Sequence, residues 1–286
     1  MSVDDPVILT CAVSGALASR DQCPAIPYTP AEYAAEARRV VDEGGVMVHL
    51  HARTPSGAPS HAIEDFRAIT EAIRAEVGDA VIVNFSTGAL GVPVETRIAY
   101  LRALRPEVGA LNMGSMNYAK YSARRHGWVF KAVFENSFDT IEALLGSMVE
   151  AGIRPEHECF DSGHVASLDP LLDMGLLKPP LQISFVMGVV GGIRPTARNV
   201  AHLAEQVPDV PHQWGVIGIS RAQWGLLAAA LSLGGNVRVG LEDNFYLPSG
   251  EMARSNGELV ARAARMATDA GRRLATVAEA REMLGL

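Results

Sequence analysis

The sequence VMVHLH at residues 46–51 combines a short apolar run with two histidines at its end. A continuous apolar run of this length predicts a buried β-strand. Side chains alternate between the two faces of a strand, so His49 and His51 leave the same face. Two neutral imidazoles at a strand end are a common beginning of a divalent metal site, zinc first. An isolated His-x-His pair also fits two ordinary histidines, so residues farther along the chain must decide.

Strand-like and helical segments alternate outward from this stretch along the whole chain. Predicted strands cover residues 7–13, 46–51, 80–85, 109–112, 154–160, 181–186, 214–218 and 237–241. Predicted helices cover residues 31–42, 63–76, 95–103, 139–151, a short segment after His164, 196–206, 221–232 and 255–270. Eight successive β–α units predict an α/β fold of the (β/α)₈, or TIM, barrel class.

The alternative is a doubly wound open sheet, which usually has fewer units and a glycine-rich phosphate turn after its first strand. Residues 14–16, SGA, do not match that turn. We therefore expect a single (β/α)₈ barrel domain over residues 1–286, with a short extra C-terminal helix at 276–284. Thr29 followed by Pro30 predicts the start of the first helix, with Thr29 as its N-cap.

Composition excludes several classes of function. The net charge of −7, with mixed signs and no block of like charge, argues against nucleic-acid binding. No apolar run reaches the roughly 18 residues of a membrane span, and the N-terminus lacks a signal-peptide pattern. Cys11, Cys23 and Cys159 are far apart and odd in number, which favours a reduced cytoplasm.

Polar side chains gather where the predicted strands end, and barrel enzymes place their chemistry at that end. They are Ser14; His49, His51 and Arg53; Asn84, Ser86, Thr87 and Gly88; Asn112 and Ser115; Glu158, Asp161 and His164; and Arg238, Glu242 and Asp243. Turn chemistry explains some of them, such as the Ser-Thr-Gly stretch, but not their density.

Glu242 is the predicted third metal ligand, because the last strand closes the barrel beside the first two strands. Two histidines, one carboxylate and open positions form a recognised catalytic zinc arrangement. Asp243 points elsewhere and is freer to act as a base. Arg238 shares the parity of Glu242 and has three interpretations: it holds a substrate carboxylate, orients Asp243, or forms a structural salt bridge.

These residues lie in stretches that resemble the β-keto acid cleavage enzymes across nearly the whole chain. The matching stretches are TPAE at 29–32, VHLHAR at 48–53, STG at 86–88, LNMGS at 111–115, ECFDSG at 158–163, FVMG at 185–188, GG at 191–192 and GLEDN at 240–244. Each stretch alone is weak, whereas all of them in this order are specific.

The resemblance implies a homotetrameric (β/α)₈ barrel with one Zn²⁺ held by His49, His51 and Glu242. It implies condensation of a β-keto acid with acetyl-CoA, giving acetoacetate and a new CoA thioester by a reverse Claisen mechanism. Asp243, supported by Arg238, corresponds to the base. The substrate-site positions are Ser86, Thr87, Gly88, Asn112, Ser115 and Glu158.

Some residues depart from the family pattern. Leu17 stands where relatives that handle an amino-bearing keto acid carry an acidic residue, so we predict a substrate without that amine. Tyr118 or Trp128 either stacks on a quaternary ammonium or packs in the fold. The basic segment 117–134 either binds an acidic substrate or CoA phosphates, or is a solvated loop. Gly191 and Gly192 permit close backbone approach of the CoA.

Two rival functions remain open at this stage. Amidohydrolase-type barrels also use His-x-His, but on their first strand and with further histidines on strands five and six. Here the pair is on the second predicted strand, and residues 181–186 contain no histidine. An inactive metal-binding barrel is the second rival, and the intact set of His49, His51, Glu242 and Asp243 argues against it.

Overall fold

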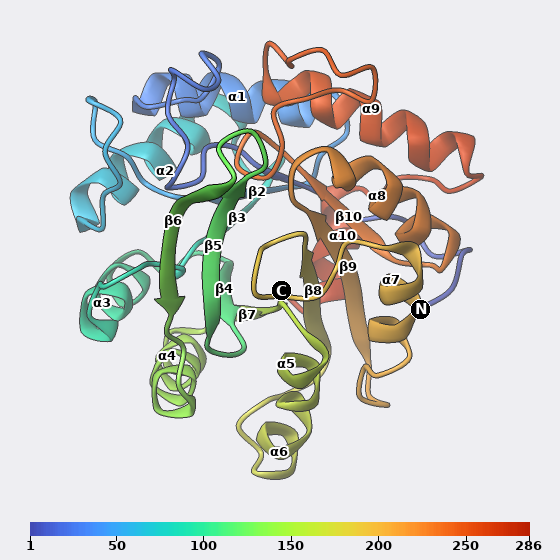
Figure 1. Cartoon of the computed structure of the whole chain (residues 1–286). Helices are drawn as coiled ribbons and strands as arrows, with labels where there is room; N and C mark the ends of the chain where they lie inside the picture. The colour runs from blue at the N-terminus through green and yellow to red at the C-terminus, as the bar shows by residue number, and fades with distance from the viewer.

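The computed structural model describes residues 1–286 and contains a closed barrel of eight parallel strands surrounded by helices (Figure 1). The order around the barrel is β1-β10-β9-β8-β7-β4-β3-β2. The strands are β1 (Leu9–Ala12), β2 (Met47–Leu50), β3 (Ile82–Phe85), β4 (Val108–Asn112), β7 (Arg154–Cys159), β8 (Leu181–Met187), β9 (His212–Gly218) and β10 (Asn236–Val239). The predicted barrel is confirmed, including the closure of its last strand on its first.

Ten α-helices follow or flank these strands. They are α1 (Pro30–Asp42), α2 (Ile63–Val77), α3 (Val94–Leu104), α4 (Phe138–Ala151), α5 (Ser162–Ala166), α6 (Leu168–Asp173), α7 (Ala197–Ala204), α8 (Gln223–Ser232), α9 (Asn256–Asp269) and α10 (Val277–Leu284). The helix expected after His164 begins earlier, since α5 starts at Ser162 and includes this histidine. No helix has both the length and the apolar composition to cross a bilayer.

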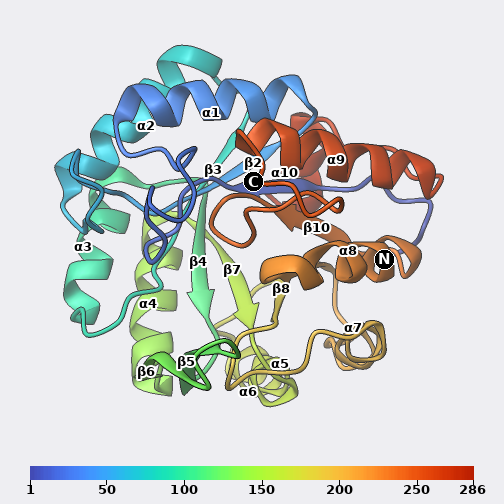
Figure 2. The same ribbon diagram turned by 45° about the horizontal axis from the view of Figure 1, so that its top comes forward.

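The first helix shows how local sequence sets an element. Thr29 accepts a hydrogen bond from the backbone N–H of Glu32, and the Glu32 carboxylate accepts one from the N–H of Thr29. This capping box satisfies two of the N–H groups that a helix start leaves unpaired. The predicted N-cap is confirmed, and α1 packs between α2 and α9 on the outside of the barrel (Figure 2).

Two further strands form an antiparallel hairpin that the sequence interpretation missed. They are β5 (Met116–Ser122) and β6 (Gly127–Phe134), and Figure 1 shows them in front of the barrel. The segment predicted as either a binding segment or a solvated loop is therefore a regular hairpin. Its strands were hidden because basic and small residues interrupt the apolar alternation that marks a strand.

The loop after β8 packs directly against this hairpin. A Cβ at Gly191 would lie 1.7 Å from the carbonyl oxygen of Asn117, and one at Gly192 would lie 2.8 Å from that of Phe160. The sequence analysis expected these glycines to admit CoA. In the structure the close approach is to the chain's own backbone, because the hairpin covers this position.

Candidate active site

Three side chains with metal-binding atoms meet at the carboxyl end of the barrel. His49 is on β2, His51 follows that strand, and Glu242 follows β10. The Nε2 atoms of His49 and His51 lie 3.7 Å and 3.3 Å from carboxylate oxygens of Glu242. One ligand atom from each residue lies within 4.8 Å of the other two. The structure thus brings the three predicted ligands together.

A glycine turn carries Glu242 to this position. Gly240 has φ = 137°, and a Cβ there would lie 2.1 Å from the carbonyl oxygen of Ala12 on β1. A side chain is excluded by both the conformation and the close contact. The chain therefore crosses the end of β1 and places Glu242 beside the histidines of β2.

The protonation states of these residues fit a metal. Burial, followed by the positive charge of Arg238, lowers the pKa of His49 well below its ordinary value, which keeps the imidazole neutral. Burial would raise the pKa of Glu242, but His51, His49 and Arg238 outweigh it and hold this pKa well below the usual range. Glu242 Oε2 is buried with no hydrogen-bond partner. An imidazole, imidazole and carboxylate donor set with an unpartnered oxygen suits a divalent cation.

Hydrogen bonds from α1 and from the loop after β1 hold the backbone of His51. The hydroxyl of Tyr33 donates to the His51 carbonyl oxygen at 2.6 Å, and Ser14 Oγ donates to the same oxygen at 3.1 Å. Tyr33 is fully buried, so its ring has little freedom. Tyr33 was not among the predicted site residues, because nothing in its local pattern links a helix tyrosine to a distant strand end.

Arg238 on β10 is the centre of a buried network of carboxylates. Its Nε and Nη2 donate to Oδ2 and Oδ1 of Asp243 at 2.9 and 3.0 Å. Its Nη1 donates to Glu158 at 3.0 Å, and Nη2 lies 3.2 Å from Glu242. Of the three interpretations offered for Arg238, the geometry fits two: it orients Asp243, and it forms a buried salt bridge inside the barrel. Asp243 is thus held at both oxygens rather than free.

The two carboxyl groups beside Arg238 differ in acidity. Burial, supported by the charge of Glu242 and opposed by Arg238, raises the pKa of Asp243 to about 6. Burial, supported by Glu156, raises the pKa of Glu158 to about 8. Carboxyl groups whose environments separate their pKa values are suited to different acid and base roles. At neutral pH Asp243 is therefore ionised and able to accept a proton, whereas Glu158 keeps its proton.

The predicted substrate residues fall into two sets. A Cβ on Gly88 would lie 3.3 Å from Asn112 Nδ2 and 3.6 Å from Ser86 Oγ, so these three residues are neighbours. Asn112 Nδ2 is buried without a partner and is available to a ligand. Thr87, in contrast, donates its hydroxyl to the carbonyl oxygen of Ala110, which gives it a structural contact.

Ser115 lies at the base of the hairpin. Its Oγ accepts a hydrogen bond from the backbone N–H of Asn136 at 2.7 Å. The proton of the Ser115 hydroxyl therefore stays available for another acceptor. This contact also ties the end of β6 to the loop that follows β4.

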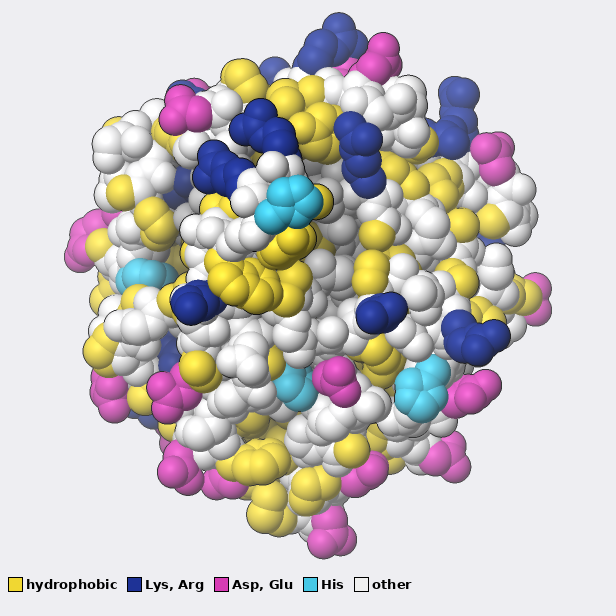
Figure 3. Space-filling view, in the orientation of Figure 1, with side chains coloured by type: hydrophobic (Ala, Val, Ile, Leu, Met, Phe, Trp, Pro, Cys, Tyr) yellow, Lys and Arg dark blue, Asp and Glu magenta, His cyan; other side chains and the backbone are white.

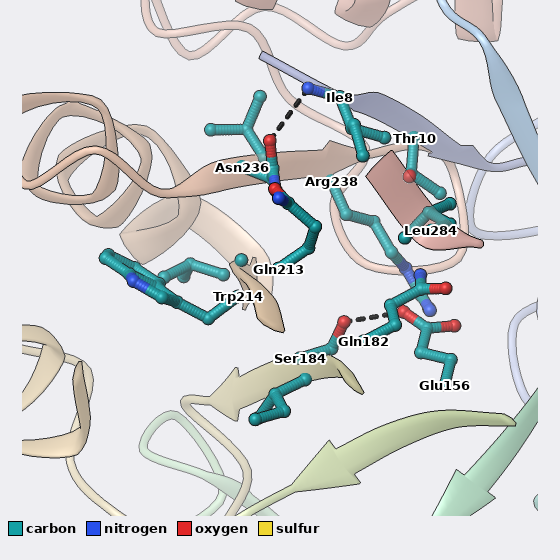
Figure 4. A pocket seen from close by; sticks show the side chains of 14 residues that line it. Ile8, Thr10, Glu156, Gln182, Ser184, Gln213, Trp214, Asn236, Arg238 and Leu284 are labelled. Atoms are coloured by element: carbon teal, nitrogen blue, oxygen red, sulfur yellow. Dashed lines mark hydrogen bonds between the residues drawn. The ribbon is translucent and has the colours of Figure 1, made fainter. Parts of the chain in front are cut away.

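Glu156 is a buried carboxylate that the sequence analysis missed. Its side chain accepts hydrogen bonds from Asn84 Nδ2 and from Ser184 Oγ, the latter at 2.6 Å. Figure 4 shows Glu156, Ser184 and Arg238 directed into the barrel interior, where a cavity of about 20 Å³ remains. The signal was available, because Glu156 and Glu158 are two residues apart and share a strand face.

The chain was compared with known proteins. Residues 6–286 match the family model described as beta-keto acid cleavage enzyme. A 3-keto-5-aminohexanoate cleavage enzyme of Fusobacterium nucleatum is 35% identical over 282 residues, which are 99% of this chain and 98% of that protein. A 3,5-dioxohexanoate:acetyl-CoA acetone transferase of Paraburkholderia graminis is 34% identical over 303 residues, covering 100% and 97%.

A solved structure supports the fold. The apo structure of ObcA superposes with a TM-score of 0.74 at 22% identity, covering 92% of this chain and 66% of ObcA. The expected resemblance and the expected enzyme class are both confirmed by the family match over nearly the whole chain. The chain belongs to the beta-keto acid cleavage enzyme family.

Proposed function

We propose that this enzyme condenses a β-keto acid with acetyl-CoA, giving acetoacetate and the CoA thioester of the remaining acyl group. The family supports the cleavage, and the name of the Paraburkholderia graminis relative includes acetyl-CoA. The observation that carries the proposal is local. Asp243 is held by Arg238 directly beside the convergent His49, His51 and Glu242.

In this proposal His49, His51 and Glu242 hold one Zn²⁺. The donor set and the unpartnered Glu242 oxygen support this assignment. Bound zinc supplies a Lewis acid that polarises a carbonyl oxygen at the site. The remaining chemistry belongs to the protein's own residues.

Asp243 takes a proton from the methylene group between the keto and carboxylate groups of the substrate. The resulting carbon nucleophile attacks the thioester carbonyl of acetyl-CoA and releases the CoA thiolate. That thiolate attacks the original keto carbon, and the bond from this carbon to the former methylene carbon breaks. The acetoacetate carbanion released by this cleavage takes back the proton held by Asp243 and leaves with the acetyl group, and the acyl remainder leaves as its CoA thioester, so atoms and charge balance. Arg238 keeps the Asp243 carboxylate in one plane throughout.

Substrate binding is assigned to the residues around this centre. Ser86, Gly88 and Asn112 form a polar wall, and Ser115 and protonated Glu158 offer hydrogen-bond donors. Thr87, between Ser86 and Gly88, supports this wall through its hydroxyl's bond to Ala110 and the bond that its carbonyl oxygen accepts from Arg97. Leu17, in the loop after β1, is 59% exposed and has no charge to pair with an ammonium group. We therefore assign a substrate without an amine at that end.

The same resemblance supports a homotetramer in which each chain is one barrel domain with α10 as an added helix. The three cysteines are free and buried, which is consistent with a reduced, cytoplasmic setting. Light scattering on the purified protein measures the subunit number directly.

The deciding experiment is a substrate panel. Zinc-loaded enzyme is incubated with acetyl-CoA and β-keto acids that carry no charge, a carboxylate or an ammonium group, and acetoacetate is assayed. Acetoacetate that forms only when thioester is present supports the proposal. Turnover without acetyl-CoA would favour the hydrolase alternative. Zinc binding without turnover across the whole panel would favour an inactive metal-binding barrel.

A further inference from the structure

The β5–β6 hairpin presents two aromatic rings to solvent. Tyr121 is 49% exposed and Trp128 is 55% exposed, and their ring centroids lie 5.6 Å apart. They are a cross-strand pair next to an irregularity in the ladder. Exposed aromatic rings are costly in water and commonly mark a binding surface. Neither ring packs in the core.

The hairpin also carries an excess of positive charge. Between residues 116 and 134 there are four cationic side chains and no acidic one, in a chain whose net charge is −7. The cationic residues are Lys120, Arg124, Arg125 and Lys131. None of them forms a salt bridge, although the chain has many elsewhere. Figure 3 shows basic and apolar side chains gathered together over this hairpin.

The base of the hairpin reaches the active site. Met116 and Phe134 are buried in a cluster with Phe160, Val186 and Ile217. Burial, followed by the negative charges of Glu242, Asp243 and Glu158, raises the pKa of Tyr118 to about 12. The Tyr118 side chain therefore lies close enough to the site for these carboxylates to act on it. Strand residues advance about 3.4 Å each, which puts Tyr121 roughly 10 Å farther out than Tyr118. The hairpin therefore runs from the site to the aromatic and basic surface.

We propose that the outer part of this hairpin binds the 3′-phospho-ADP end of CoA. This inference rests on the proposed function, which brings the thioester of acetyl-CoA to Asp243, and the base of the hairpin lies beside that site. The pantetheine arm of CoA separates the thioester from a nucleotide with a flat adenine and anionic phosphates. Adenine stacks on Trp128, which the Tyr121 ring meets at 74°, and the phosphates pair with Arg124 and Arg125 at the hairpin tip.

Charge favours this occupant over a second copy of the chain. Two copies that met through the same patch would bring like charges together, because a two-fold interface pairs each surface with itself. A bisphosphorylated nucleotide neutralises the patch instead. The loop at Gly191 packs against β5 and supports the hairpin without a ligand.

The kinetic test compares two thioesters. The double variant R124E/R125E is assayed with acetyl-CoA and with S-acetylpantetheine, which lacks the nucleotide. We expect the KM for acetyl-CoA to rise about tenfold or more, while the KM values for S-acetylpantetheine and for the β-keto acid stay within twofold. The control K178E/R265E makes the same charge change at exposed positions away from the hairpin. We expect it to leave all three KM values unchanged. A parallel rise for both thioesters, or no rise, overturns the proposal.

The binding test does not depend on turnover. Trp128 is the exposed tryptophan, whereas Trp214 and Trp224 are 4% and 8% exposed. Adenosine 3′,5′-bisphosphate is expected to quench tryptophan fluorescence in the unmodified enzyme, with a salt-sensitive affinity, and not in W128F. Absence of quenching, or equal quenching in W128F, overturns the proposal. If R124E/R125E instead changes the subunit number in light scattering, the surface belongs to a second copy. Quenching without acetoacetate formation would keep this site and reject the proposed function.

Discussion

Arg238 and Asp243 form a buried two-point ion pair, with both carboxylate oxygens of Asp243 accepting hydrogen bonds from one guanidinium group at 2.9 and 3.0 Å. The pair fixes the plane of the carboxylate. The same guanidinium contacts Glu158 and Glu242, so each of its three nitrogens already lies against a carboxyl group of the site. Arg238 therefore acts through the site's acids.

Replacing Asp243 tests the assigned base. Asp243→Asn keeps the size of the side chain but removes the proton acceptor, so we expect kcat to fall on the order of 10²–10⁴-fold. Metal content, measured by plasma mass spectrometry, should stay at the unmodified level. A kcat within threefold of the unmodified enzyme would rule out Asp243 as the base.

Arg238→Lys tests the two-point geometry. Lysine keeps the positive charge but has no planar fork, so it cannot hold both oxygens of Asp243 in one plane. We expect kcat to drop roughly tenfold or more, with a smaller change in KM, and the thermal midpoint to fall. Unchanged kcat in a folded variant would show that charge alone is sufficient.

Removing the metal ligands tests the zinc assignment. Glu242→Gln and His51→Ala should each lose bound zinc, because three protein ligands are the minimum of a catalytic zinc site. Dialysis against a chelator should lower the thermal midpoint of the unmodified enzyme, and zinc should restore it. Glu150→Gln is the matched control, since this side chain is 70% exposed and far along α4. Full zinc content in Glu242→Gln would contradict the ligand set.

Tyr33→Phe tests how the backbone of His51 is held. Loss of the hydroxyl removes the 2.6 Å hydrogen bond to the His51 carbonyl oxygen, at a cost of about 1 kcal/mol in the free energy of unfolding. We also expect zinc affinity to fall several-fold, as measured by competition with a chromophoric chelator. Thr29→Ala, which removes the cap of the same helix, costs about 1 kcal/mol but should leave zinc affinity unchanged. Equal zinc affinities in both variants would show that Tyr33 only stabilises the fold.

The burial of His157 leads us to expect that the enzyme loses stability in acid. It is buried on β7, its Nδ1 lies 2.8 Å from the carbonyl oxygen of Gln182, and burial lowers its pKa to about 4. The unfolded chain binds a proton near pH 6.5 and the folded chain only near pH 4, so stability present above pH 6.5 is lost as the pH falls between these values. By pH 5 the loss amounts to about 2 kcal/mol.

Denaturant unfolding at pH 7.5 and pH 5 measures this effect. The variant His157→Gln should lose about 2 kcal/mol less between the two pH values than the unmodified enzyme does. His202→Gln, on the exposed face of α7, serves as the control. An equal loss in His157→Gln and in the unmodified enzyme would remove His157 as the cause.

The uncharged side chain of Leu17 leads us to expect a preference for substrates without an amine. The unmodified enzyme should favour β-keto acids without an amine, and Leu17→Glu should shift the ratio of kcat/KM toward an amino-bearing analogue by about fivefold, as expected for one exposed ion pair. Steady-state kinetics on the two acids measure the ratio. A preference of the unmodified enzyme for the amino acid analogue would contradict this assignment.

The sequence by itself determined the barrel and the positions of its candidate metal ligands. Both depend on local periodicity: eight short apolar strands alternate with helices, and His49 and His51 share a strand face because the strand repeat is two. Parallel strands that all end on one rim then place Glu242 on the same rim as the histidines. The family resemblance added the expected chemistry.

Tertiary structure alone decided how these residues are held. The fork of Arg238 on Asp243, the hydroxyl of Tyr33 on His51 and the β5–β6 hairpin all join segments whose pairing no local pattern encodes. The turn at Gly240 illustrates the reason, because its φ of 137° and its contact with Ala12 set where Glu242 and Asp243 point. Side-chain direction beyond a strand end is set by non-local packing, whereas strand and helix periodicity is set by the chain itself.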